Sequence, residues 1–123
     1  MTKPSRYENY SFYAKTSEGS TIKMLIDTFC KQLSKIELNI NNEHITSQMM
    51  NGKEKNNMLY DLELYKNDFD EYYCENEHIF GLNAHHTQDQ TYSVKKKNTV
   101  IMYIEKSSPD KFSFEIIPQM NGE

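Results

Sequence analysis

The sequence lacks several features that would assign it to a class of protein. Of its 123 residues only Cys30 and Cys74 are cysteines, too few for a disulfide framework. The N-terminal residues MTKPSRYENY are polar and carry no signal-peptide pattern, and the longest apolar run is far shorter than a membrane span. We therefore expect a soluble, intracellular protein with reduced thiols and no membrane contact.

Positive charge is also scarce. The chain has 14 Lys and Arg against 18 Asp and Glu, which gives a net charge of −4 and a pI near 5.6. Bulk charge therefore cannot attract nucleic acid, and a DNA contact would need a local basic face. Lys23 and Lys31 with Lys95, Lys96 and Lys97 could form such a face. Composition alone favours a solvated helix face and a charged turn instead, and the sequence does not decide between the two.

Signals for catalysis are missing as well. The sequence has no Gly-rich phosphate loop, no serine-centred elbow and no paired-carboxylate motif. Cys74 has His78 four residues on, but the neighbouring Glu75 and Glu77 would raise the pKa of its thiol rather than lower it. We predict that Cys74 packs in the core, and that the protein is not an enzyme and needs no cofactor.

A group of histidines raises the alternative of a metal site. His85 and Asp89 would share one face of a helix, a spacing that zinc sites use, and His86 and His78 lie nearby in the sequence. A closed site needs more ligands, and no second cluster occurs at metal-ligand spacing. We predict solvated histidines and no metal, and a metal-dependent enzyme is the least favoured hypothesis.

Hydrophobic periodicity predicts an α+β domain. Residues 19–34 are expected to form one clear amphipathic helix, capped by Ser20 or Thr21. Residues 84–98 are polar and weakly periodic, so they are left open between a short helix and a loop. Strands are predicted at 11–16, 35–41, 44–50, 58–65, 79–82, 98–106 and 111–118. The prediction is an antiparallel sheet with a helix on one face, comprising a flexible arm (1–10), one domain (11–118) and a tail (119–123).

The stretch FDEYYCENEHIFGLN carries a family resemblance. Phe69-Asp70-x-Tyr72-x-Cys74 followed by Gly81-Leu82-Asn83 resembles the F-D-x-Y-x-C and G-V-N landmarks of proliferating cell nuclear antigen, the DNA sliding clamp. Upstream, FYAKTSEGSTIKMLIDTF is similar to the first strand and helix of that family, and LNINNEHITSQMM to the paired strands before its Q-x-M element. These motifs occur in the same order over residues 11–118.

The resemblance implies a function. Clamps of this family are rings around duplex DNA, with helices lining the channel and sheets outside, and they tether polymerases during replication and repair. By this resemblance we expect Lys23 and Lys31 to contact DNA, with Lys95, Lys96 and Lys97 as a local addition. Met50 falls at the family methionine that lines the partner-peptide pocket. The expected location is the nucleus or a viral replication site.

The chain also departs from the family pattern. It corresponds to about one of the two subdomains of a clamp protomer, so we expect a first half that would form a homo-oligomeric ring only at full length. AHHTQDQTY lacks the apolar stripe and lysines of the second family helix. The alternative hypothesis is a clamp-derived protein-interaction module that does not encircle DNA and binds through an exposed sheet edge.

Overall fold

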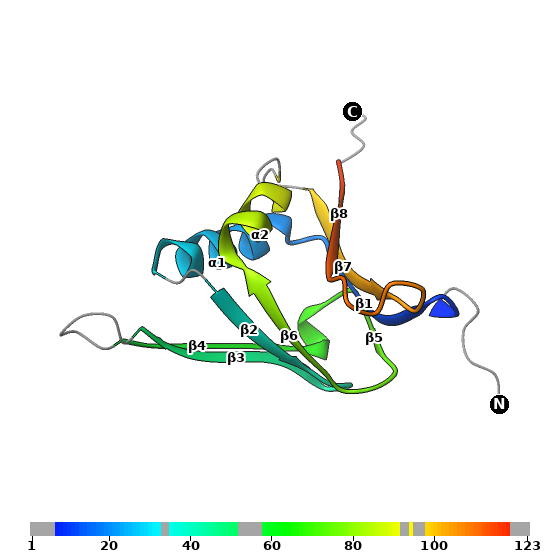
Figure 1. Cartoon of the computed structure of the whole chain (residues 1–123). Coiled ribbons are helices and arrows are strands. Elements are labelled where there is room, and N and C mark those ends of the chain that lie inside the picture. The colour runs from blue at the N-terminus through cyan, green and yellow to red at the C-terminus, as the bar shows by residue number, and fades with distance from the viewer. Residues whose placement is uncertain (1–6, 33–34, 52–57, 92–93, 95–97, 119–123) are drawn as a thin grey trace.

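The computed structural model describes residues 7–32, 35–51, 58–91, 94 and 98–118 (Figure 1). The elements in chain order are β1 (Tyr10–Thr16), α1 (Gly19–Gln32), β2 (Lys35–Ile40), β3 (His44–Asn51), β4 (Met58–Tyr65), the 3-10 turn η2 (Lys66–Asp68), β5 (Glu71–Cys74), β6 (His78–Asn83), α2 (Ala84–Thr91), β7 (Thr99–Glu105) and β8 (Ser113–Ile117). The α+β class is confirmed, and the second helix is present. Neither of the two described helices has the length and apolar content that crossing a membrane would need.

The strands form two antiparallel sheets of four strands each. The first sheet has the order β5-β1-β7-β8 and the second the order β4-β3-β2-β6. Figure 1 shows α1 and α2 together on one side, next to both sheets. The sequence predicted antiparallel strands but did not divide them between two sheets, because period-two alternation shows which face of a strand is buried and not which strand it pairs with.

Apolar faces of both sheets meet under α1. In β2 the side chains of Ile36, Leu38 and Ile40 are buried while their neighbours are exposed, as the alternation predicted. The core cluster draws on both sheets and both helices, and its buried members are Phe12, Ala14, Ile22, Phe29, Ile36, Leu38, Ile40, Ile45, Ala84, Val94, Val100, Met102, Ile104 and Phe112. Burial of these side chains is the main force that holds the domain together.

Helix α1 begins one residue before its predicted caps. Ser20 and Thr21 lie inside the helix, and the Oγ1 of Thr16 accepts the backbone N–H of Glu18 (3.0 Å) just before the helix begins at Gly19. The helix is amphipathic as predicted, and Ile22 and Phe29 on its apolar face are buried. Leu33, four residues after Phe29 on the same face by helical spacing, lies outside the described residues.

The segment from Phe69 to Asn83 connects the two sheets. β5 pairs with β1 in the first sheet, and β6 pairs with β2 in the second. The hydroxyl of Tyr72 in β5 donates to the backbone carbonyl of Asn41 (2.7 Å), which lies between β2 and β3. Sequence reasoning predicted only the second of these strands, because β5 is four residues long and all four are only partly buried.

The N-terminal boundary also differs from the prediction. Tyr7 stacks on Tyr73, and the backbone N–H of Lys106 donates to the carbonyl of Asn9 (2.9 Å). Residues 7–10 therefore belong to the folded domain, because tertiary contacts hold a stretch whose composition alone indicated a flexible arm. The rest of the predicted arm, and the tail at 119–123, lie outside the described residues.

Close packing at Gly19 gives a first testable prediction. Its N–H donates to the carbonyl of Asn98 (3.1 Å), and an added Cβ would fall against that same carbonyl oxygen. We expect Gly19→Ala to lower the free energy of unfolding by about 1–3 kcal/mol, because backbone cannot move aside as a side-chain end can. Urea denaturation followed by circular dichroism measures the change.

The matched control is Gly81→Ala, because nothing lies within 4 Å of a Cβ added there. This variant should be unchanged or slightly more stable. Equal destabilisation of the two variants would contradict the assigned contact.

Candidate nucleic-acid interface

The two helices pack beside each other and form a helix layer, defined here as α1 and α2. Asp27 of α1 connects them: its Oδ2 accepts from Lys23 Nζ (2.8 Å), and its Oδ1 accepts from Gln88 Nε2 of α2 (3.1 Å). One carboxylate therefore orients a lysine on its own helix and binds the neighbouring helix.

Helix α2 can approach α1 closely because the side chains on its buried face are small. Its buried residues are Ala84, Thr87 and Thr91, and the hydroxyl of Thr91 donates to the carbonyl of Thr87 (3.2 Å). The side chain of Asn83 caps the helix by accepting the backbone N–H of His86 (2.8 Å). Sequence reasoning left this segment open because an Ala-Thr face gives no apolar stripe, although an asparagine before it is a helix-start signal.

Lys23 is the one predicted DNA-contact residue whose side chain the structure describes. Its side chain is 29% exposed and forms an i,i+4 ion pair with Asp27. Such pairs contribute only about 0.3–0.5 kcal/mol, so the lysine can exchange Asp27 for another anion at small cost. Sequence reasoning did not assign this pair, although the i,i+4 spacing of Lys23 and Asp27 is a signal for it. The hydrogen bond from Gln88 depends on tertiary packing.

The other predicted DNA-contact residues are placed only in part. The backbone of Lys31 lies in α1, two turns after Lys23, and its side chain is not described. Lys95, Lys96 and Lys97 lie outside the described residues. Within the described part of the helix layer, the remaining exposed charge is Asp89, beside exposed His85 and His86.

The histidines do not meet other ligands in the described structure. His85, His86 and Asp89 are exposed on α2, while His78 begins β6 and is half-buried. No group of three or more potential metal ligands occurs among the described residues. The i,i+4 spacing of His85 and Asp89 is real, but no further described ligand joins them.

Cys74 packs against the core, as predicted. Its thiol donates to the carbonyl of Asn76 (3.0 Å). Burial raises the pKa of this thiol to about 11, with a smaller contribution from Glu77. The sequence predicted the direction from the neighbouring carboxylates, whereas burial is the larger cause in the structure.

Met50, the predicted partner-peptide residue, lies in β3 and pairs in register with Leu59 of β4. β4 is the last strand of its sheet in the described structure, so Met50 belongs to a hairpin at the sheet edge. Its side chain is not described.

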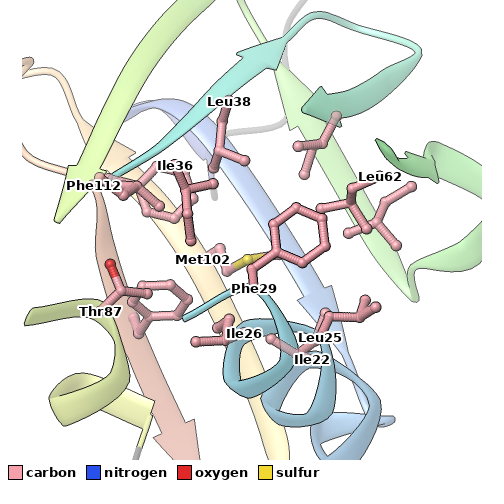
Figure 2. Close-up of a pocket in the computed structure, with 14 residues that line it drawn as sticks. Ile22, Leu25, Ile26, Phe29, Ile36, Leu38, Leu62, Thr87, Met102 and Phe112 are labelled. Atoms are coloured by element: carbon pink, nitrogen blue, oxygen red, sulfur yellow. The ribbon is translucent and has the colours of Figure 1, made fainter. Parts of the chain in front are cut away.

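An apolar cavity lies in the interior. It has a volume of about 60 Å³, and Figure 2 shows side chains of α1 and of both sheets pointing into it, among them Phe29, Leu38 and Met102. Every lining residue except Thr87 is apolar. Because no charged or convergent polar groups line it, it has the character of packing space in the core and not of a substrate site.

Comparison with known proteins assigns the fold to a family. The family model "Proliferating cell nuclear antigen, N-terminal domain" matches residues 11–121. The chain belongs to the proliferating cell nuclear antigen family. A crystal structure of proliferating cellular nuclear antigen from Entamoeba histolytica is similar at a TM-score of 0.72 and 19% sequence identity, over 93% of this chain and 49% of that chain. A search of curated proteins finds no match.

The comparison confirms the family resemblance seen in the sequence motifs and the clamp-domain fold of this chain. That fold is a non-enzymatic scaffold in the family. The chain spans about half the length of the Entamoeba clamp that it matches.

The raised pKa of Cys74 leads to a testable prediction. In a Cys30→Ser variant, where Cys74 is the remaining thiol, about one thiol in a thousand is ionised at pH 8. We expect iodoacetamide to alkylate the folded protein about a hundredfold more slowly than the same variant in urea, with a rate that rises about tenfold per pH unit up to pH 10. Equal rates in the folded and unfolded states would show that Cys74 is neither buried nor perturbed.

Proposed function

We propose that this chain forms the first half of a DNA sliding clamp, which encircles duplex DNA and tethers a polymerase and other replication and repair proteins. The observation that carries the proposal is the match of residues 11–121 to the clamp N-terminal domain, supported by the similar clamp fold. In this fold α1 and α2 lie side by side and are joined by Asp27 and Gln88. Because the chain spans about half of the clamp it matches, ring closure needs further clamp domains.

The proposed DNA contacts are electrostatic. Lys23, Lys31 and Lys95–Lys97 would neutralise phosphates from the helix layer without hydrogen bonds to bases. Contacts of this kind have nearly the same energy at every register of the duplex, so they permit sliding and carry no sequence information. Overall acidity is compatible with this role, because only one face needs to be basic.

The proposed partner site is in the second sheet. Met50 in the β3-β4 hairpin would contribute to an apolar pocket for short peptides of clamp-binding proteins. The ring would act without catalysis, as a homo-oligomer, wherever DNA is replicated, in the nucleus or at a viral replication site.

The DNA contacts can be tested through salt dependence. We expect the double variant Lys23→Gln/Lys31→Gln to bind duplex DNA more weakly, and the slope of log K against log[salt] to fall by about one for each lysine that contacts a phosphate. Fluorescence anisotropy with labelled duplexes of two unrelated sequences measures both the slope and the absence of sequence preference.

The control variant is Lys66→Gln. Lys66 lies in η2, away from the helix layer, where it forms an ion pair with Glu43 (3.6 Å). It should bind DNA as the unaltered protein does. If the slope of log K against log[salt] is the same in the double variant as in the unaltered protein, the helix layer does not contact DNA.

A second function is supported by the charge of the described helix layer. Helices α1 and α2 carry two lysines, Lys23 and Lys31, and two aspartates, Asp27 and Asp89, so their formal charges sum to zero. This balance favours a clamp-derived interaction module that does not encircle DNA.

Assembly state and DNA topology separate these two functions. The test needs the chain together with the further clamp domains that ring closure requires. A ring then sediments as a closed oligomer, stays on circular duplex and slides off the ends of the linearised form. An assembly that does not close and is retained on neither form would support the interaction module instead.

A further inference from the structure

Five tyrosines gather on the solvent face of the first sheet. In β1 the side chains of Phe12 and Ala14 enter the core, so Tyr13 between them points to the opposite face. Tyr13 pairs in register with Tyr73 of β5 and with Tyr103 of β7, which places three tyrosines in one row across adjacent strands.

Two further tyrosines join this row. Tyr7 stacks on Tyr73 with ring centroids 4.8 Å apart and planes 11° apart, and it also contacts Tyr13 at 5.3 Å. Tyr10 contacts Tyr13 at 5.1 Å and Tyr103 at 5.6 Å. All five rings are partly exposed. We call this surface the tyrosine patch, comprising Tyr7, Tyr10, Tyr13, Tyr73 and Tyr103.

Carboxylates border the tyrosine patch. Glu71 accepts from the hydroxyl of Tyr7 (2.8 Å) and pairs with Lys15 (3.6 Å). Glu105 is opposite Tyr10 in the β1-β7 register, and Glu115 is opposite Ile101 in the β7-β8 register. Both glutamates are exposed, and neither forms an ion pair with another described residue. Lys106, which follows Glu105, pairs with Glu75 (3.6 Å). Among the described residues, the carboxylates of Glu71, Glu75, Glu105 and Glu115 therefore outnumber the ammonium groups of Lys15 and Lys106 at this surface.

The electrostatic environment of Tyr10 agrees with this geometry. Burial raises its pKa above the usual value of a phenol, and the charges of Glu105 and Glu115 raise it further. Both carboxylates are therefore close enough to act on the ring cluster electrostatically.

The tyrosine rings and the carboxylates around them together determine which charge a ligand of this surface carries. Aromatic ring faces attract cations, and they do so more strongly when carboxylates surround them. Proteins that stack nucleic-acid bases on aromatic rings combine them with a basic groove that follows the phosphates. The rim of the tyrosine patch has the opposite sign, so it repels phosphates and favours cationic groups.

We propose that the tyrosine patch is a docking surface for an extended, arginine-bearing segment of a partner protein. A guanidinium group is planar, so it can stack on a tyrosine ring while its N–H groups donate to a carboxylate, whereas a lysine ammonium is only a point charge. The patch lies on the first sheet, whereas Met50 lies in the second, so this surface is separate from the peptide site of the proposed function.

The test uses the full chain and a fluorescein-labelled peptide of alternating arginine and serine. Matched peptides carry lysine or glutamate in place of arginine. We expect anisotropy to show the strongest binding for the arginine peptide, weaker binding for the lysine peptide and none for the glutamate peptide. Because the chain contains no tryptophan, the same titration should change its intrinsic tyrosine fluorescence.

Charge-reversal variants locate the binding site. Glu105→Lys/Glu115→Lys should weaken binding of the arginine peptide by about tenfold or more. The control Glu37→Lys/Glu63→Lys changes the net charge by the same amount, but at exposed residues of the second sheet. Its affinity for the arginine peptide should fall much less. Equal losses in the two variants would show attraction to the overall negative charge and overturn the proposal.

Ring variants separate stacking from apolar contact. Tyr73→Phe keeps the ring and should bind as the unaltered chain does, whereas Tyr73→Leu keeps much of the apolar area and should bind about fivefold more weakly. Thermal unfolding of both variants verifies that the sheet is intact. Equal binding by both would overturn the role of ring faces.

Other occupants give different outcomes, each of which would overturn the proposal. Binding of single-stranded oligothymidine that is lost in Tyr73→Leu would assign the patch to nucleic acid. Self-association abolished by Glu105→Lys/Glu115→Lys would assign it to a second copy of the chain. Peptide binding that appears only after deletion of residues 2–6, which include Lys3 and Arg6, would make the chain itself the occupant.

Discussion

Burial of one apolar stripe on α1 is the interaction on which the rest of the structure depends. The space beneath this helix is lined by side chains from β2, β3, β4 and β6 of one sheet and from β7 and β8 of the other. Neither sheet can remove its apolar face from water by itself. Helix α1 packs against the apolar faces of both sheets and so covers them. Phe29 at the centre of this contact is therefore a structural residue, although it lies on the helix that also carries the candidate DNA-binding lysines.

The same helix has two faces with separate tasks. Its inner face contributes Ile22 and Phe29 to the core, and its outer face carries Lys23 and Asp27. Asp27 joins these tasks, since it binds Gln88 of α2 and also holds Lys23. A carboxylate reduces the local positive charge of the surface proposed to face DNA, but Asp27 also fixes the neighbouring helix. Asp27 therefore weakens the attraction of this surface for anions, and at the same time it fixes α2 beside α1.

The first sheet is likewise used on both faces. Its inner face contributes Phe12 and Met102 to the core, and its outer face carries the tyrosine patch. The helix layer and the patch are thus separated by the core, and the chemistry proposed for them differs: lysines for phosphates on the helix layer, and ring faces with carboxylates for cations on the patch. In the proposed clamp, DNA and a basic partner would therefore bind without competing for one surface.

Local patterns in the sequence were enough to determine the elements and their buried faces. The stripe of α1 and the alternation of β2 follow from side-chain periodicity, and periodicity depends only on nearby residues. The collinear motifs from Phe69 to Asn83 were also enough to indicate the clamp family. Only the tertiary structure decided that the strands form two sheets, that Ala84, Thr87 and Thr91 make a helix face, and that Tyr7, Tyr13, Tyr73 and Tyr103 meet. The physical reason is that pairing and side-chain clustering join residues far apart in the chain, and no local pattern records which distant strand will lie alongside.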